Sequence, residues 1–249
     1  MSESLDQFDF HAVSIPDQVR DAVKKAILDG RLRPSDRLPS EEQMAKRFCV
    51  SKTVLREALG QLVAEGWIEK RRGALGGSFV AEGNSKRIFH SVVDCYHLGG
   101  LDIEEVFEFR RLMEPVFLGM ACERRTDEDL GILFQNLEAC RGALDRGEVD
   151  RWKQVEFHRL IAEACHNRLV ISAMGAAIAI SREFTSRLPF STEDGKADYM
   201  YNLRFYECIQ ERRADEGKAL MVEHFERSRE LVERYRRMSP ETSSRPAST

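Results

Sequence analysis

The chain has 249 residues, of which 42% are hydrophobic and 32% charged, and this ordinary globular composition excludes a fibrous or wholly disordered protein. No apolar run is long enough to span a membrane, and the polar, acidic N-terminus lacks the pattern of a signal peptide, so we expect a cytoplasmic protein with no membrane partner. The net charge is -4, but residues 16–80 hold 13 Lys and Arg against 9 Asp and Glu, which joins a mildly basic segment (+4) to an acidic remainder (-8). A net charge of +4 over this segment is also typical of an ordinary solvated surface. The function of the segment therefore has to be inferred from its sequence motifs.

Six cysteines stand at positions 49, 95, 122, 140, 165 and 208 in apolar, helix-like surroundings, and no two of them form a C-x-x-C pair. This spacing favours reduced thiols over disulfides or a zinc finger. We expect all six to be packing residues.

The first predicted element begins near Pro16 and ends before Gly30, because Val19 and Val23 recur at helical spacing between a proline suited to the first turn and a glycine suited to the end. Residues 1–14, which have no sustained period, are expected to form a mobile N-terminus.

Residues 37–80 hold two short helical patterns, each opened by a serine. Ser40 and Gln43 form a capping box at the start of the first helix, and Cys49 and Val50 fill a tight turn. Ser51 opens the second helix, whose buried face is predicted to carry the apolar residues Val54, Leu55, Ala58, Leu59 and Leu62.

The free face of that second helix carries Lys52, Thr53 and Arg56. After Gly66, a short apolar strand, a basic glycine-punctuated turn over 69–77 and a returning strand over 78–80 follow. This order predicts a winged helix-turn-helix domain over residues 15–81, with the second helix as the element that enters the major groove of double-stranded DNA.

Several stretches of this segment resemble the GntR family of bacterial transcription regulators, namely L-P-S-E, V-S-K-T-V-L-R-E-A-L, L-V-A-E-G-W-I and G-G-S-F-V. The resemblance implies that Lys52, Thr53 and Arg56, with the wing residues Arg71, Arg72 and Gly73, are DNA-binding residues, and that the protein joins the bacterial nucleoid when bound to its operator. One departure is Glu42, because the family usually has arginine there. Either this acid turns away from DNA or the operator differs from the family norm.

A polar linker is predicted over residues 82–87, followed by an all-α effector-binding and dimerisation domain over 88–237 and a disordered tail over 238–249. No strand pattern follows the wing, so the fold class is mostly α, with a helical bundle after the winged domain. The expected helices cover roughly 86–98, 102–124, 127–145, 149–165, 168–188, 196–211 and 215–237.

The bundle has its own resemblance, through E-V-F-E-F-R-R-L-M-E-P-V, F-H-R-L-I-A-E-A-C-H-N-R-L and A-L-M-V-E-H-F, to the FCD effector domain of the FadR-type branch. Such domains bind a small carboxylate metabolite, frequently beside a divalent metal such as zinc or nickel. The family's metal motif is an aspartate and a histidine four residues apart, followed by two further histidines. This chain has Gln154, His158, Asn202 and His224 at these positions.

Two of the four expected ligands are therefore neutral amides, which bind transition metals weakly and bring no negative charge. Two interpretations stay open: a weakened metal site on His158 and His224, or a metal-free polar pocket in which all four side chains hydrogen-bond the effector. Taken singly, each histidine would be read as a satisfied core residue.

Arg110 is a further candidate for effector binding. Val106, Phe109, Met113 and Phe117 mark the buried side of its helix, so a guanidinium near that side requires an anionic partner. The resemblance assigns this arginine to the pocket, where it would bind a carboxylate through two hydrogen bonds. The alternative is an internal pair with Glu114, four residues along the helix.

Together these patterns predict a ligand-responsive transcription regulator, a repressor that binds a palindromic operator as a homodimer and responds to a small organic acid. No catalytic residues can be assigned. Two alternatives remain: a metal-dependent enzyme domain fused to a DNA-binding module, and a DNA-binding protein that needs no ligand and has a closed, apolar bundle interior.

Overall fold

The computed structural model describes residues 14–73 and 76–238, with side chains up to position 234. The predicted mobile N-terminus and disordered tail lie, apart from residues 14 and 238, outside the described residues. The chain divides into two compact units, Met1–Asn84 and Ser85–Thr249. The described residues of the first unit form three helices and a two-stranded sheet, and all described elements of the second unit are helices.

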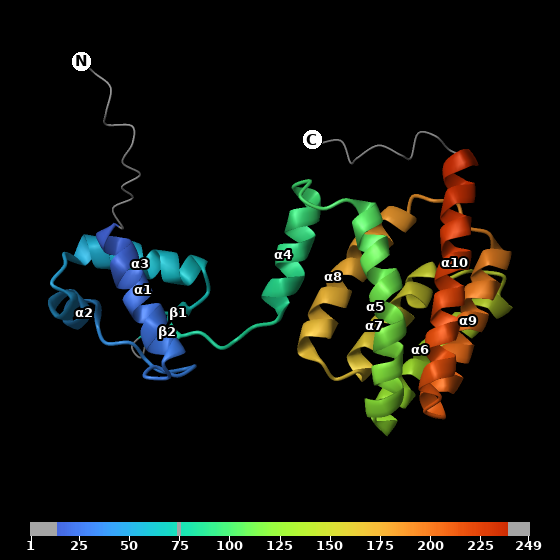
Figure 1. The fold of residues 1–249 in the computed structure, drawn as a ribbon, viewed down its shortest axis with the longest axis horizontal. Coiled ribbons are helices and arrows are strands. Elements are labelled where there is room, and N and C mark those ends of the chain that lie inside the picture. Colours follow the sequence, from blue (N-terminus) through green and yellow to red (C-terminus); the bar gives the residue numbers. More distant parts are fainter. Residues whose placement is uncertain (1–13, 74–75, 239–249) are drawn as a thin grey trace, which may run out of the picture. The chain divides into compact units, whose positions relative to one another are not determined.

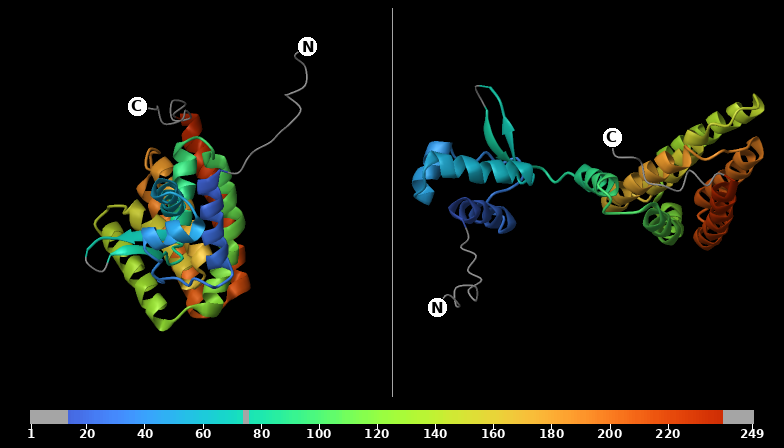
Figure 2. Two further views of the ribbon diagram at one scale, coloured as in Figure 1. Left: turned by 90° about the vertical axis from the view of Figure 1, so that its left-hand side faces the viewer. Right: turned by 90° about the horizontal axis from the view of Figure 1, so that it is seen from above.

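The first unit is built from α1 (Ile15–Leu28), α2 (Glu41–Phe48), α3 (Lys52–Ala64), β1 (Ile68–Arg71) and β2 (Gly77–Val80). The predicted capping box of Ser40 and Gln43 starts α2, and Cys49 ends it in the left-handed conformation with a φ of 56°. The two strands are antiparallel, and Ile68 is paired with Val80. Figure 2 shows the hairpin projecting from the three helices. The basic residues Lys70 and Arg71 belong to β1 rather than to the turn in which the sequence pattern placed them.

One apolar core holds this unit together, because α1, α2, α3 and the hairpin each bury residues in it. Four of the five residues predicted for the buried face of α3, Leu55, Ala58, Leu59 and Leu62, are buried, and Val54 is half-buried. The opposite face of α3 is left exposed.

The second unit is a bundle of seven helices in the described residues (Figure 1). Their bounds are α4 (Lys86–His97), α5 (Ile103–Arg124), α6 (Asp127–Asp145), α7 (Arg151–Ala164), α8 (Arg168–Thr185), α9 (Thr192–Gln210) and α10 (Ala214–Met238). The helix α9 begins at Thr192, earlier than the start near residue 196 predicted from the spacing of apolar residues. Ser191 and Asp194 form a capping box at its start. None of the described helices is long and apolar enough to cross a membrane.

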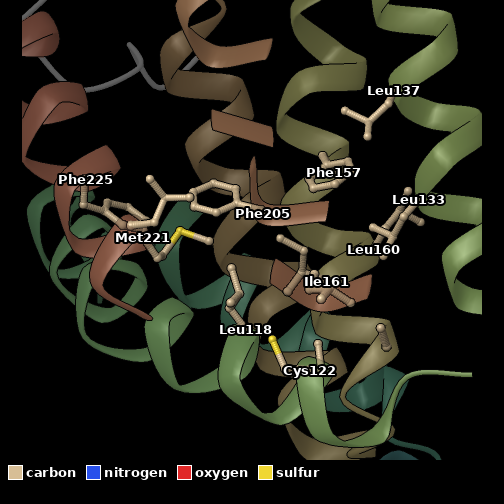
Figure 3. Close-up of a cluster of buried hydrophobic side chains, with 14 residues drawn as sticks. Leu118, Cys122, Leu133, Leu137, Phe157, Leu160, Ile161, Phe205, Met221 and Phe225 are labelled. Atoms are coloured by element: carbon tan, nitrogen blue, oxygen red, sulfur yellow. The ribbon is translucent and has the colours of Figure 1, made fainter. Parts of the chain in front are cut away.

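The main core of the bundle lies between α5, α6, α7, α9 and α10. Figure 3 shows how it is filled: Leu118 and Cys122 come from α5, Phe157 and Ile161 from α7, and Phe205 from α9. The aromatic rings of Phe205 and of Phe225 in α10 also contact His158 edge-on. The apolar core therefore borders a polar cluster directly.

Two expectations about buried residues are wrong. Cys49 and Cys95 are exposed, whereas the other four cysteines are buried, and all six are free thiols. Cys49 lies at a helix terminus and Cys95 on α4, a helix with no fully buried residue. Phe109 is also exposed, because the buried side of α5 runs through Val106, Arg110 and Glu114 instead.

Candidate functional site

The N-terminal turn of α3 presents the three residues that the sequence singled out. Ser51 caps the helix by accepting a hydrogen bond from the backbone N–H of Val54 at 3.2 Å. Lys52, Thr53 and Arg56 are all exposed on the side opposite the buried apolar residues. A helix with this exposed polar end and a firmly packed back is suited to entering a DNA groove.

Arg56 is connected to the two neighbouring elements through Glu41, which the sequence did not single out. Arg56 Nε donates to Glu41 Oε2 at 2.7 Å, and Lys70 Nζ of β1 lies 3.8 Å from Glu41 Oε1. The hydrogen bond from Arg56 lowers the pKa of Glu41. The carboxylate therefore restricts the direction of Arg56, although an exposed pair of this kind contributes little to stability.

Glu42, the departure from the family pattern, lies one residue further along α2 and is exposed. Its carboxylate pairs with Lys46 Nζ of the same helix at 3.3 Å. The acid thus has a cation beside it one helical turn away, which partly offsets its charge.

The two arginines of the wing, Arg71 and Arg72, differ in their contacts. The Arg71 guanidinium lies over the Phe79 ring at 4.3 Å and pairs with Glu69 at 2.7 Å. Arg72 and Gly73, which follow β1, are exposed, and Arg72 has no hydrogen bond or ion pair with another described residue. Arg37 braces the hairpin, because its Nη2 donates to the carbonyl of Gly76 at 2.6 Å.

In the second unit, the five residues predicted to bind an effector line one cavity of about 490 Å³. All five side chains are buried, and they come from four helices: Arg110 (α5), Gln154 and His158 (α7), Asn202 (α9) and His224 (α10). Residues up to 114 positions apart in the sequence, from 110 to 224, thus meet at one site. Cavities of this size in folded proteins commonly hold small molecules.

Glu114 is the central anion behind this cavity wall. It accepts a hydrogen bond from Arg110 Nε at 2.6 Å and lies 2.5 Å from His158 Nδ1. Burial raises the pKa of Glu114, but the charges and hydrogen bonds of Arg110 and His158 lower it more, to about 2. Because the carboxylate is ionised and can only accept, His158 Nδ1 must carry the proton, which leaves Nε2 as the other polar atom of that ring.

Arg110 both pairs with Glu114 and lines the cavity, so the two alternatives considered for this residue do not exclude each other. Nε is used by Glu114, whereas Nη1 and Nη2 form no hydrogen bond with another side chain or backbone group of the described residues. The guanidinium also lies over the Phe225 ring at 5.6 Å. Its fork remains available for an anion.

His224 stacks on His158 with the ring centroids 5.2 Å apart and an interplanar angle of 28°. Burial, reinforced by the neighbouring charge of His158, holds the pKa of His224 well below its usual range. The ring is therefore neutral at physiological pH, and its Nδ1 has no hydrogen-bond partner.

The two amides that replace metal ligands are oriented by the backbone. Gln154 Nε2 donates to the carbonyl of Gly195 at 2.7 Å, and Asn202 Nδ2 donates to the carbonyl of Gln154 at 3.1 Å. Their oxygens, Gln154 Oε1 and Asn202 Oδ1, are buried without a hydrogen-bond partner.

This set of side chains does not fit a divalent transition metal. The four family positions supply two amide oxygens and two imidazoles but no carboxylate, and within the described residues no cluster of three His, Cys, Asp or Glu side chains is arranged to hold a metal ion. The cavity residue Asp198 pairs with Arg227 at 2.6 Å, and Glu114 is bound by Arg110 and His158. A zinc or nickel ion at the four family positions would find weak donors, and the acids Asp198 and Glu114 are already paired with other side chains.

Comparison with known proteins gives two family matches. Residues 16–80 match the bacterial regulatory proteins of the gntR family, and residues 105–227 match the FCD domain. The HTH-type transcriptional regulator LutR of Bacillus subtilis is 25% identical over 214 residues, which cover 84% of this chain and 97% of that protein. The Uxu operon transcriptional regulator of Escherichia coli is 29% identical over 157 residues, covering 60% of this chain and 58% of the relative.

Among solved structures, the GntR protein of Streptococcus agalactiae is similar in fold. Its TM-score is 0.56 at 21% sequence identity, and the match covers 87% of this chain and 99% of that one. At this identity the likeness concerns the fold alone.

Proposed function

The chain belongs to the GntR family of bacterial transcription regulators and carries an FCD domain, and we propose that it represses transcription from a palindromic operator until a small organic acid binds its helical unit. The observation that carries this proposal is the pairing, in one chain, of an exposed basic helix end and a buried, polar cavity. The family is one of DNA-binding regulators rather than enzymes, which argues against a metal-dependent enzyme domain fused to a DNA-binding module.

We propose that α3 enters the major groove with Lys52, Thr53 and Arg56 and that the wing residues Arg71, Arg72 and Gly73 contact the DNA beside it. The support is chemical: these positions join long cations and a hydroxyl that reach base edges or phosphates from an exposed helix end. Arg56, directed by Glu41, is the best candidate for a base contact, because a guanidinium with a fixed direction can discriminate between bases.

The protein is proposed to act as a homodimer, since one recognition helix reads only a few base pairs and two-fold symmetry matches a palindromic site. An apolar stripe on α5 supports association, because Phe109, Leu112 and Val116 follow one another at helical spacing and are 36%, 55% and 49% exposed in the single chain. Such a stripe is costly to leave in water, and a second copy would cover it.

The effector is proposed to bind in the cavity through Arg110, Gln154, His158, Asn202 and His224. The Nη1 and Nη2 atoms of Arg110 would bind its carboxylate in a fork, with Glu114 keeping the guanidinium in place. A cavity with this many buried polar side chains argues against a ligand-independent protein, whose bundle interior would be closed and apolar. Binding would favour one of two arrangements of the bundle and so change operator affinity.

The test is the selection of operator DNA from a random pool with the full chain, followed by titration of small carboxylates against the protein–operator complex. The proposal expects a palindromic consensus and at least one acid that lowers operator affinity. Selection of no preferred sequence would overturn the operator assignment. Binding of an acid that leaves operator affinity unchanged would overturn the regulatory role of the cavity.

A further inference from the structure

Three polar atoms at the cavity are buried and have no hydrogen-bond partner: Gln154 Oε1, Asn202 Oδ1 and His224 Nδ1. The side chains that carry them are 3%, 2% and 6% exposed, and all three residues line the same cavity. Buried polar atoms in folded proteins are nearly always hydrogen-bonded, so three unpartnered atoms on residues of one cavity mark a place where a bound group would supply the missing partners.

The chemical character of the two amide atoms is fixed by their surroundings. Each amide nitrogen donates to a backbone carbonyl, Gln154 Nε2 to Gly195 and Asn202 Nδ2 to Gln154, and a backbone carbonyl can only accept. Rotating either amide by 180° would place two oxygens against each other. The unpartnered atoms are therefore carbonyl oxygens, and what completes them must be a hydrogen-bond donor or a cation.

A metal cation is a poor match for these acceptors. The amide oxygens are neutral, and the ionised Glu114 is bound to Arg110 and His158 rather than facing the unpartnered atoms. A hydroxyl or ammonium group is better suited. An ammonium group can direct one hydrogen at each of the three atoms when the proton of His224 is on Nε2. A hydroxyl donates its single hydrogen to one amide oxygen and accepts from His224 when that proton is on Nδ1, and it needs no charge compensation in a buried site.

We propose that Gln154 Oε1, Asn202 Oδ1 and His224 Nδ1 form a metal-free subsite that binds a hydroxyl or ammonium group of the effector directly. This inference rests on the proposed function, in which Arg110 binds the carboxylate. The two subsites together select a small acid with a second, protic substituent, that is, a hydroxy acid or an amino acid. In this proposal the effector site is kept, but the effector is bound by direct hydrogen bonds to the amides instead of through a metal ion.

The first test uses the metal alone and needs no knowledge of the effector. The full chain and the double variant Gln154→Asp/Asn202→His, which restores a carboxylate and a third imidazole, are incubated with Zn²⁺ or Ni²⁺, passed through gel filtration and analysed for bound metal. We expect less than about 0.1 ion per chain for the wild type and about one for the variant, since the restored set has the donors these ions prefer. Retained operator binding shows that the variant is folded.

Either of two outcomes of this test overturns the inference. A wild-type chain that retains about one ion would show that the amides serve as metal ligands. Retention by neither protein would show that the four side chains do not converge on one point. Neither result bears on whether an acid regulates operator binding, so failure here is distinct from failure of the proposed function.

The second test is calorimetric titration, in the presence of a chelator, with butyrate, 2-hydroxybutyrate and 2-aminobutyrate and with the six-carbon acids of the same series. A substituted acid should bind about tenfold more tightly than its unsubstituted parent. The hydroxy and amino members show which donor is preferred. Equal binding of parent and substituted acids would overturn the inference.

Two variants assign that preference to the subsite. Asn202→Leu should remove the difference between substituted and parent acids, because it deletes one of the acceptors. Gln61→Leu in α3 is the matched control, because Gln61 Oε1 is also buried without a partner but lies in the other unit, and it should leave the preference unchanged. A preference that survives Asn202→Leu contradicts the assignment, as does one lost equally in both variants.

Discussion

The exposed end of α3 and the cavity of the helical unit use the same residue types under opposite conditions. Arg56 is exposed with one half-buried carboxylate beside it, whereas Arg110 is buried with an ionised Glu114 that also binds His158. An exposed cation can be added or removed with little change in the free energy of unfolding, whereas a buried cation without an anionic partner destabilises the fold. The surface proposed to contact DNA is therefore free to vary at little cost in stability, whereas the cavity wall is constrained by the stability of the fold.

The largest effect is expected from breaking the buried cluster. Glu114→Ala should lower the free energy of unfolding by about 3–5 kcal/mol, because it leaves Arg110 and His158 without their shared anion. Chemical denaturation measures the loss. The matched control is Glu138→Ala, which removes an exposed partner of Arg141 and should cost less than about 1 kcal/mol. Equal losses in the two variants would contradict the contrast between buried and exposed pairs.

A smaller effect, on DNA binding rather than stability, is expected at α3. Arg56→Ala should weaken operator binding by about 1–3 kcal/mol and relax preference at one base position, whereas Lys52→Ala and Arg72→Ala should weaken all sequences alike. Fluorescence anisotropy with operator and mismatched duplexes separates these cases. Lys25→Ala, on the exposed side of α1, is the control of equal charge change. The recognition face is misassigned if none of the three α3 and wing variants differs from this control.

The next effect depends on pH. The folded-state pKa of Glu114 is about 2, below its ordinary value of 4.5, so its stabilising contribution is present above about pH 4.5 and is lost as the pH falls toward 2. The stability difference between the wild type and Glu114→Gln should therefore shrink by about 1–2 kcal/mol between pH 5 and pH 3. Denaturant titrations at both pH values measure it. A difference that stays constant would show that Glu114 is not ionised in the folded protein.

The smallest effect is expected at Glu42. Replacing this acid by arginine should tighten operator binding by about three- to tenfold and steepen its dependence on salt, because α2 would then present a cation where it now presents an acid paired with Lys46. Affinities at two salt concentrations test this. Unchanged affinity and salt dependence would mean that position 42 faces away from the DNA.

The sequence predicted the helices and the wing well, because the spacing of residues such as Leu55 and Leu59 and the capping serines are local signals. It also named five residues that line one cavity, but only through their resemblance to family positions. Nothing local marks Gln154 or Asn202 as members of one site, since they lie on different helices and 48 residues apart.

The features that the sequence missed depend on contacts between distant elements. Glu41 directs Arg56 across 15 residues, and Glu114 binds His158 across 44. The sequence suggested Glu114 only as an alternative partner of Arg110, whereas it joins two cavity residues at once. Phe109 was assigned to the buried side of α5 because positions 109 and 110 fit the helical spacing of the buried residues almost equally well. Spacing alone cannot show that the charged residue, Arg110, is the buried one.

The most direct test of the account compares one arginine from each region in a single assay. Operator binding by Arg56→Ala and Arg110→Lys is measured with and without an acid that releases the wild type. We expect Arg56→Ala to lose operator affinity, and Arg110→Lys to keep it but to respond only weakly to the acid, because lysine lacks the planar fork for a carboxylate. Normal operator binding by Arg56→Ala, or an undiminished response by Arg110→Lys, would contradict the division between a DNA-reading surface and an effector cavity.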